Sequence, residues 1–271
     1  MAAVPLPFGF EFPISPHTGR RLDAAPALLQ ASGADIILLQ EVFTARYRDV
    51  LIESMRGSHP HAFWRGGANS LMGNGLLILS RWPIDGGQFI PFADKHPLAQ
   101  SVWQRGVLMA ELQAPGIGTL RVMNVHLSPD PPFIAPDRAP TRAYRAREIE
   151  CLLAAASGAS DDTILAGDFN TSPEVCPDDY RSIVERGYRD VIADIHGTQG
   201  ISTFERGNPL VREGRYRDWP DQRADHILLK AGTRLKPLNA RIVFREPLPH
   251  PQGPAGFPLS DHYGVQVTLA R

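Results

Sequence analysis

The sequence predicts an α/β protein in which two packed β-sheets are flanked by helices. Strand-like apolar runs alternate with amphipathic helical spans, and the last strands are spaced like hairpins. With 271 residues, 43% of them hydrophobic, the chain is long enough to bury a large core. Neither a repeat nor a linker divides it, so we expect a single domain over 1–271, with 1–20 as an irregular N-terminal segment.

The expected elements follow from the spacing of apolar residues. A helix over 21–31 ends near Gly33, and the apolar run at 35–40 is typical of a buried strand that leads into Glu41. Two further helices are expected over 44–55 and 142–156. The remaining expected strands cover 75–79, 107–112, 120–126, 163–166, 226–230, 240–244 and 264–269.

Composition and charge exclude several protein classes. No apolar run approaches the roughly 20 residues that span a bilayer. The first residues lack the pattern of a secretory signal, which predicts a cytoplasmic protein. Cys151 and Cys176 could pair but are too few for a disulfide framework, and we expect Cys151 to be a core residue. Acidic residues intersperse the arginines of 138–147 and 212–223, and the net charge is −1, which favours solvated surface over a polynucleotide-binding face.

Polar side chains stand at the ends of five strand-like runs. They are Glu41, His126, Asp168 with Asn170, Asp225 with His226, and Asp261 with His262. One such residue taken alone is more often a cap or a turn residue. Five sets in one chain are different, because strand ends lie side by side in a sheet and their side chains can converge on one site.

Two of these residues are suited to hold a metal ion. Glu41 and Asp261 offer hard oxygen ligands, which favour Mg²⁺ or Mn²⁺ over zinc. Such an ion polarises a phosphoryl oxygen and stabilises the leaving alkoxide. The chain has neither the spacing of a zinc site nor a G-x-S-x-G nucleophile motif. Direct attack of water on a phosphodiester is therefore the predicted reaction.

The remaining polar residues are suited to handle protons and phosphate. Asp168 could take a proton from the attacking water or hold it, while Asn170 fixes the phosphate or the aspartate. His262 has the donor pattern to bind phosphate as an imidazolium, and a carboxylate such as Asp225 could orient it and raise its pKa.

Five short motifs resemble the endonuclease/exonuclease/phosphatase superfamily in their order and spacing. They are Leu-Gln-Glu-Val (39–42), Asn-Val-His-Leu (124–127), Gly-Asp-Phe-Asn (167–170), Ala-Asp-His-Ile (224–227) and Leu-Ser-Asp-His (259–262). Each motif alone is weak, but the ordered set covers the chain from about residue 35 to the end. The resemblance implies a four-layer α/β sandwich with the site at one end of two packed sheets.

The resemblance also implies a role for each site residue. Glu41 resembles the principal metal ligand, and Asp261 resembles the terminal metal-side aspartate. Asp168 and Asn170 resemble the pair that activates water and binds phosphate, and His126 resembles the histidine that contacts the phosphate or the leaving group. His262 resembles the catalytic histidine near the end of the domain, and Asp225 resembles the aspartate that orients it.

The N-terminal stretch departs from the superfamily pattern. Members normally begin with a strand that ends in an asparagine near the metal. Here the stretch before Arg21 contains neither an asparagine nor a strand-like run, and the next asparagine is Asn69. We therefore expect that the fold lacks its first strand, that Met1 is an internal or misassigned start, and that activity and metal affinity suffer.

Three readings of the function stay open at this point. The segments 73–84 and 257–262 and the helix at 142–153 resemble the neutral sphingomyelinase branch, which favours a phospholipid or another small phosphodiester as substrate. The alternatives are a DNA or RNA nuclease and a catalytically weak binding module. No stable protein partner is implied. Two aromatic loops, 89–92 with Trp103 and 131–134, either touch a lipid surface or pack inward.

Overall fold

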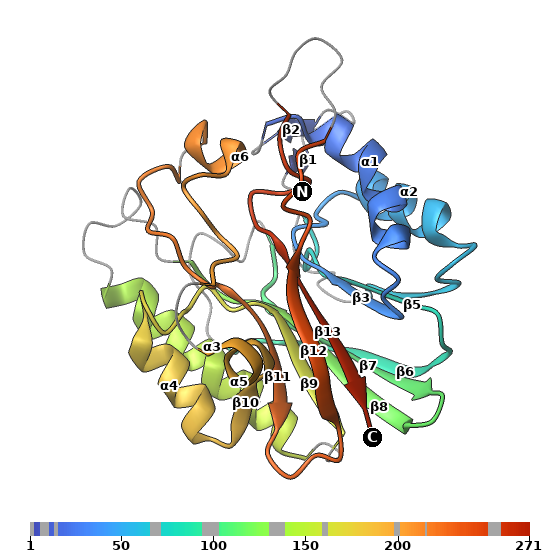
Figure 1. Cartoon of the computed structure of the whole chain (residues 1–271), viewed down its shortest axis with the longest axis vertical. Coiled ribbons are helices and arrows are strands. Elements are labelled where there is room, and N and C mark those ends of the chain that lie inside the picture. Colours follow the sequence, from blue (N-terminus) through green and yellow to red (C-terminus); the bar gives the residue numbers. More distant parts are fainter. Residues whose placement is uncertain are drawn as a thin grey trace.

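A computed structural model of the chain shows two central β-sheets with helices on both outer sides (Figure 1). The structure describes residues 16–65, 72–93, 103–129, 139–158, 162–197, 201–214, 216–248 and 256–271, and the backbone of 3–5 and 11–13. The predicted aromatic loop at 131–134 lies outside these ranges.

The larger sheet has six strands and one parallel pair. Their order is β10 (Tyr188–Asp190), β11 (Asp225–Lys230), β9 (Thr163–Asp168), β8 (Gly118–His126), β7 (Gly106–Ala114) and β6 (Ile84–Pro91). Only β8 and β9 run parallel, and α3 (Ala139–Ser157) lies between them in the chain. The parallel pairing brings the C-terminal ends of β8 and β9 to the same edge of the sheet.

A second layer of strands packs on the inner face of the larger sheet. It consists of β3 (Ile36–Leu39), β5 (Leu77–Ser80) and β4 (His61–Phe63), together with the hairpin of β12 (Lys236–Val243) and β13 (Gly264–Ala270). The core between the layers joins Ile78 of β5 to Leu108, Val122 and Ile164 of the larger sheet. The fully buried members of this inter-sheet core are all aliphatic, as expected for strands that are buried on both faces.

Helices cover the two outer faces and complete four layers. On one side α1 (Thr18–Ala31) and α2 (Ala45–Met55) pack on β3 and β5, while α3 and α4 (Pro177–Glu185) lie on the outer face of the larger sheet. α3 presents Ile149, Leu152, Leu153 and Ala156, a spacing of three and four residues, to that sheet. Two shorter helices, α5 (Val191–His196) and α6 (Pro209–Arg212), follow α4. The predicted four-layer α/β sandwich is confirmed.

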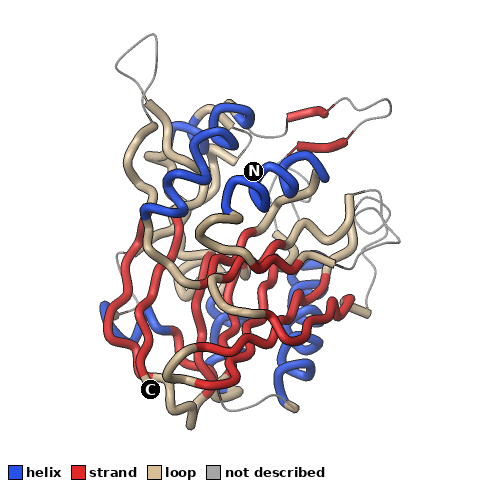
Figure 2. Tube along the Cα trace, turned by 90° about the vertical axis from the view of Figure 1, so that its right-hand side faces the viewer, coloured by secondary structure: helices blue, strands red, loops and turns tan. Residues whose placement is uncertain are grey.

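The N-terminal segment differs from the sequence-based expectation. We expected no strand before residue 21, but β1 (Ala3–Pro5) and β2 (Glu11–Pro13) form a short antiparallel pair. This pair lies apart from both sheets in Figure 2. In the part of the chain that the structure describes, no additional strand joins β3 to β13.

The structure decides the open alternative for the segment 89–92, which packs inward, and corrects the expectation for the arginine clusters. The segment at 89–92 is not a loop: Phe89 belongs to β6 and packs on the inter-sheet core, and Phe92 is buried beneath α3. The arginine clusters are not simply solvated surface either, because Arg145 and Arg223 are completely buried. Each of these two arginines lies within ion-pair distance of a carboxylate, Asp179 and Asp190 respectively.

No helix among the described residues has both the length and the apolar character needed to cross a membrane. Cys151 and Cys176 are both free thiols, and Cys151 is half-buried against the core beneath α3.

Candidate active site

Three of the predicted site residues form a row across the larger sheet. His126 at the end of β8 is the register partner of Asp168 at the end of β9, and Asp168 is in turn the register partner of Asp225 at the start of β11. Register partners on neighbouring strands point to the same face of a sheet. The strand pairing alone therefore brings an imidazole and two carboxylates together.

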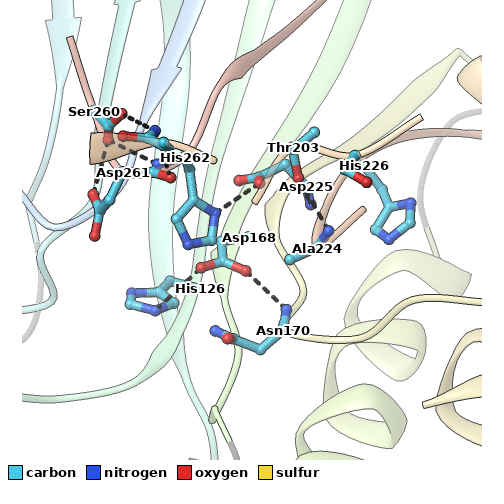
Figure 3. A network of polar contacts seen from close by, with 12 residues as sticks. His126, Asp168, Asn170, Thr203, Ala224, Asp225, His226, Ser260, Asp261 and His262 are labelled. Atoms are coloured by element: carbon cyan, nitrogen blue, oxygen red, sulfur yellow. Dashed lines mark hydrogen bonds and ion pairs between the residues drawn. The ribbon is translucent and has the colours of Figure 1, made fainter. Parts of the chain in front are cut away.

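The opposite layer supplies the rest of the site. Glu41 follows β3, while Asp261 and His262 precede β13. All seven predicted residues line one small pocket with a volume of about 100 Å³. They are Glu41, His126, Asp168, Asn170, Asp225, Asp261 and His262. In Figure 3 the His262 ring lies between Asp225 and Asp168.

A glycine makes the close approach of β8 and β9 possible. Gly167 has a φ of 138°, and an added Cβ would lie 2.1 Å from the carbonyl oxygen of Val125. No other residue type fits this backbone without a shift of β8. Gly167 thus sets the position of its neighbour Asp168 relative to His126.

His262 is held as a cation by the carboxylates around it. Its Nδ1 lies 2.8 Å from Oδ2 of Asp225. Burial disfavours the charged ring, but Asp225 and Asp168 outweigh burial and raise the pKa of His262 well above its usual value. With Nδ1 donating to Asp225, the Nε2–H of the imidazolium is free to serve as a second donor.

Asp168 has a pKa above the usual value of an aspartate. Burial and the nearby Asp225 raise the pKa of Asp168 to about 7, although His262 opposes the shift. Its Oδ1 accepts a hydrogen bond from the backbone N–H of Asn170 at 2.8 Å. A carboxylate whose pKa lies near neutrality is suited to exchange a proton with water.

His126 differs from His262 in its protonation. Burial, together with the positive charges of Arg105 and His262, lowers the pKa of His126 well below its usual value, so the ring is neutral. Its Nε2 lies 3.6 Å from Oδ2 of Asp168. Arg105 donates to the backbone carbonyl of His126 at 2.8 Å and fixes the end of β8.

Two residues that the sequence did not identify position the Asp225–His262 pair. Thr203 Oγ1 accepts hydrogen bonds from the backbone N–H groups of Ala224 and Asp225, at 3.1 and 3.2 Å. Phe204 forms an isolated bridge with His262 and lies edge-on to its ring, with centroids 5.2 Å apart. Thr203 and Phe204 belong to a loop without periodicity, so no sequence signal marks them.

Glu41 has an unusual backbone conformation that its neighbours hold. Its φ is 60°, in the left-handed region that non-glycine residues rarely adopt. On one side Gln40 donates its side-chain amide to Oδ1 of buried Asn124 at 2.7 Å, and on the other the N–H of Val42 donates to Gly75. Strain held in this way is common at binding sites, where it aims a side chain.

Asp261 faces a buried guanidinium from the other end of the chain. Nη2 of Arg21 lies 3.7 Å from Oδ1 of Asp261, and Nε of Arg21 donates to the carbonyl of Leu259 at 2.7 Å. Although burial opposes it, His262 and Arg21 hold the pKa of Asp261 below its usual value. Asp261 is therefore ionised at neutral pH.

The donor set of the pocket fits a divalent cation. Glu41 and Asp261 contribute carboxylate oxygens, the ligand type that Mg²⁺ prefers, and the pocket holds four acidic side chains in all. Asp168, Asp225 and His262 have ligand atoms within 4.8 Å of one another. A protonated His262, paired with Asp225, has no lone pair to offer a metal ion. Glu41 and Asp261 are therefore the better candidates for metal ligands.

Comparison with known proteins agrees with this geometry. The model of the endonuclease/exonuclease/phosphatase family matches residues 14–262. The chain belongs to this family. Family membership and the hydrolytic relatives support phosphodiester hydrolysis in general, whereas the ion and the substrate are separate questions.

One relative aligns over most of this chain. The relative is a Drosophila melanogaster protein whose name, neutral sphingomyelinase, is itself an inference. It is 26% identical to this chain over 257 residues, which are 92% of this chain and 56% of the relative. The chain thus spans little more than half of that relative's length.

Solved structures share the fold at low sequence identity. Sphingomyelinase C from Streptomyces griseocarneus superposes with a TM-score of 0.71 at 20% identity, covering 95% of this chain and 93% of its own. A Staphylococcus aureus beta toxin variant with bound magnesium ions gives 0.69 at 14%, covering 93% and 92%. D. rerio TDP2 in complex with a single-strand DNA product gives 0.69 at 19%, covering 94% and 93%.

Proposed function

We propose that this family member is a Mg²⁺-dependent phosphodiesterase that cleaves a phospholipid headgroup by direct attack of water. The observation that carries the proposal is the division of proton states in one pocket. Asp168 has a pKa raised to about 7, while His262 beside it has a pKa well above its usual value. A base and a cationic donor that face the same small space can act on the two sides of one phosphodiester.

The chain's own residues would share the work as follows. Asp168, held by the N–H of Asn170, accepts a proton from the attacking water. His262, fixed by Asp225, donates from Nε2 to a phosphoryl oxygen as negative charge develops there. His126 is neutral and 3.6 Å from Asp168, which suits it to contact the phosphate or the leaving group.

Glu41 and Asp261 would hold the metal ion. The ion would supply charge to a phosphoryl oxygen and to the leaving alkoxide. Arg21 lies beside Asp261, one of the two proposed ligands. Its buried positive charge limits the repulsion between Asp261 and the neighbouring carboxylates. Manganese satisfies the same oxygen ligands, so it would substitute for magnesium.

The phospholipid substrate is the less direct part of the proposal. It is supported by the similarity to the inferred D. melanogaster neutral sphingomyelinase and to the S. griseocarneus enzyme. The net charge of −1 adds to this support, because proteins that hold long nucleic acids usually have a basic face. A nuclease is the second candidate, since the TDP2 structure with a DNA product shares the fold.

The decisive experiment measures Mg²⁺-dependent turnover on sphingomyelin in mixed micelles and on nicked or abasic duplex DNA, each with and without EDTA. We expect release of phosphocholine that EDTA abolishes. His262→Ala should lower kcat by about 10²- to 10⁴-fold, the range for loss of an acid–base or electrostatic group. His61→Ala, on β4 and outside the pocket lining, is the matched control. Cleavage of DNA but not of sphingomyelin would show that the protein is a nuclease instead. Normal turnover by His262→Ala would refute the assignment of the active site.

A further inference from the structure

His226 belongs to the same motif as Asp225 but does not line the catalytic pocket. Successive side chains of a strand point to opposite faces, so Asp225 faces the pocket and His226 faces away from it. His226 shares that far face with Leu228, which packs beneath α3 and α4. Figure 3 shows its ring directed away from the pocket, and only 2% of the residue is exposed. The division of roles proposed above gives this buried imidazole no part.

The His226 ring joins two separate segments of the chain. A carbonyl can only accept, so Nε2 donates to the backbone carbonyl of Thr171, at 2.9 Å, on the segment that leaves β9. Nδ1 lies 2.9 Å from Oδ2 of Asp190, at the end of β10. The rings of Phe169 and Tyr180 pack on the imidazole, with centroids 5.6 and 5.5 Å away. Both ring nitrogens and the neighbouring rings therefore fix its orientation.

Asp190 is a well-held anchor for one side of the ring. Nη2 of Arg223 lies 2.8 Å from its Oδ2, and both side chains are almost completely buried. The hydroxyl of Tyr180 donates to the same oxygen at 3.1 Å, and the N–H of Ile192 in α5 donates to Oδ1. Although burial opposes it, His226 and Arg223 hold the pKa of Asp190 below its usual value. Breaking a buried ion pair is costly, so the contact with Asp190 should contribute more to stability than the contact with Thr171.

Thr171 directly follows a pocket residue with an unusual backbone conformation. Asn170 has a φ of 48°, in the left-handed region that few non-glycine residues adopt. Its N–H donates to Oδ1 of Asp168 at 2.8 Å, so the conformation of Asn170 sets the orientation of that carboxylate. His226 holds the next carbonyl along the chain and itself adjoins Asp225 on β11. One hydrogen bond thus couples the turn after β9 to the start of β11.

We propose that His226 is a positioning residue that acts on hydrolysis through its bond to Thr171. This bond holds the turn at Asn170 and so keeps Asp168 aligned for proton transfer. The inference rests on the proposed function, because it assigns a task to the same pocket. The contrasting role is a purely structural one, in which only the contact with Asp190 matters.

Two amide variants separate the two contacts of the ring. In His226→Gln the amide nitrogen takes about the place of Nε2 and can donate to Thr171, whereas in His226→Asn it takes about the place of Nδ1 and can reach only Asp190. With Mg²⁺ and sphingomyelin in mixed micelles, we expect kcat to fall about 10- to 100-fold in His226→Asn and less than about threefold in His226→Gln. KM should change less than about threefold in both, because neither variant removes a group that contacts the substrate. A purely structural role predicts the reverse order, since His226→Gln loses the buried ion.

His59→Asn is the matched control for these variants. His59 is also 2% exposed, and its Nε2 bonds the backbone carbonyl of Ala34 at 2.9 Å, but it does not line the pocket. The control should lower the melting temperature and leave kcat within about threefold of the parent protein. Loss of a buried histidine would then be separated from loss of the bond to Thr171.

A measurement without substrate reports the position of the turn. The amide of Asn170 should exchange hydrogen at least about tenfold faster in His226→Asn than in the parent protein, and at the parental rate in His226→Gln. An inactive parent protein would refute the proposed function, and exchange at Asn170 would still decide whether His226 holds the turn. Equal exchange in all three proteins, a near-parental kcat of His226→Asn, or an equal loss of kcat in both variants would overturn the positioning role.

Discussion

Two histidines of one pocket are held in opposite proton states. His126 is neutral because it is buried beside Arg105 and His262. His262 is cationic because Asp225 and Asp168 offset the cost of its burial. The difference arises from the neighbours of each ring rather than from the imidazoles themselves, so single substitutions of those neighbours should redistribute the protons.

Asp225→Asn should move both limbs of the pH profile to lower pH. Asp225 raises the pKa of His262. Without the Asp225 carboxylate, His262 therefore gives up its proton at a lower pH, and the alkaline limb of the profile moves down. Asp225 also raises the pKa of Asp168, so the required carboxylate forms at lower pH in the variant. The measurement is kcat/KM against pH, with exposed Asp178→Asn as control. An alkaline limb that stays in place would contradict the pairing of Asp225 with His262.

Glu41→Ala should raise the Mg²⁺ concentration needed for half-maximal activity by at least about tenfold. The variant removes one of two proposed carboxylate ligands, and each ligand adds to affinity. Titration of activity and isothermal calorimetry with Mg²⁺ alone both report the change. Glu53→Ala, exposed on α2, should titrate like the parent protein. An unchanged titration of Glu41→Ala would remove Glu41 from the metal site.

The sequence could predict which side chains meet, but not what holds them. All seven predicted residues line one pocket because each lies at a strand end or within three residues of one. The sequence did not predict the roles of Thr203, Phe204 and Arg21. A loop carries the first two and a helix carries the third, and contacts between distant parts of the chain bring them to the pocket. Periodicity and short motifs carry no information about such contacts.

At the scale of elements, the parallel contact of β8 and β9 depends on Gly167. Gly167→Ala should lower the free energy of unfolding by about 2 to 4 kcal/mol, because the new Cβ meets the carbonyl of Val125 and the φ of 138° is strained for alanine. Activity should fall with it, since Asp168 shifts.

Denaturant unfolding measures this change. Gly158→Ala is the matched control, because a Cβ there meets nothing within 4 Å. Equal stability of the two variants would show that β8 adapts to a side chain at position 167.

α3 also holds the chain that leaves β8 toward the site. Glu148 is buried and accepts hydrogen bonds from the N–H and the hydroxyl of Ser128, at 2.7 and 2.8 Å, while Arg145 donates to the Ser128 carbonyl at 3.0 Å. Ser128 follows His126 by two residues. The helix therefore positions one side of the pocket without lining it.

Glu148→Gln should destabilise the fold by about 1.5 to 3 kcal/mol, the range for a charge-assisted hydrogen bond with a buried partner. Glu150→Gln loses only an exposed ion pair with Arg186 and should cost less than about 1 kcal/mol. Thermal unfolding of both variants gives the comparison. Equal melting temperatures of the two variants would show that the hydrogen bonds of Glu148 with Ser128 do not stabilise the fold.

Secondary structure was predictable where the apolar pattern is regular. The expected strand at 120–126 lies within β8, and the expected helix at 142–156 lies within α3. β6 was missed because Gly86 and Gly87 interrupt its pattern, and it is a strand only because β7 pairs with it. The short elements α5 and α6 likewise depend on tertiary contacts and on side-chain caps from Asp190 and Asn208.

At the scale of the whole molecule, the four layers followed from the resemblance of five motifs and are confirmed. The larger sheet forms one layer, and the strands β3, β5 and β4 with the hairpin of β12 and β13 form the layer that faces it. Which strands share a layer depends on pairings between distant parts of the chain, and no single motif specifies them.

The pocket draws on both extremes of the chain. Arg21 donates to Leu259, 238 positions away, and Asp261 and His262 enter the pocket just ahead of the last strand. A polypeptide cut anywhere before Asp261 therefore lacks the cationic histidine and the carboxylate beside it, however well the two sheets pack.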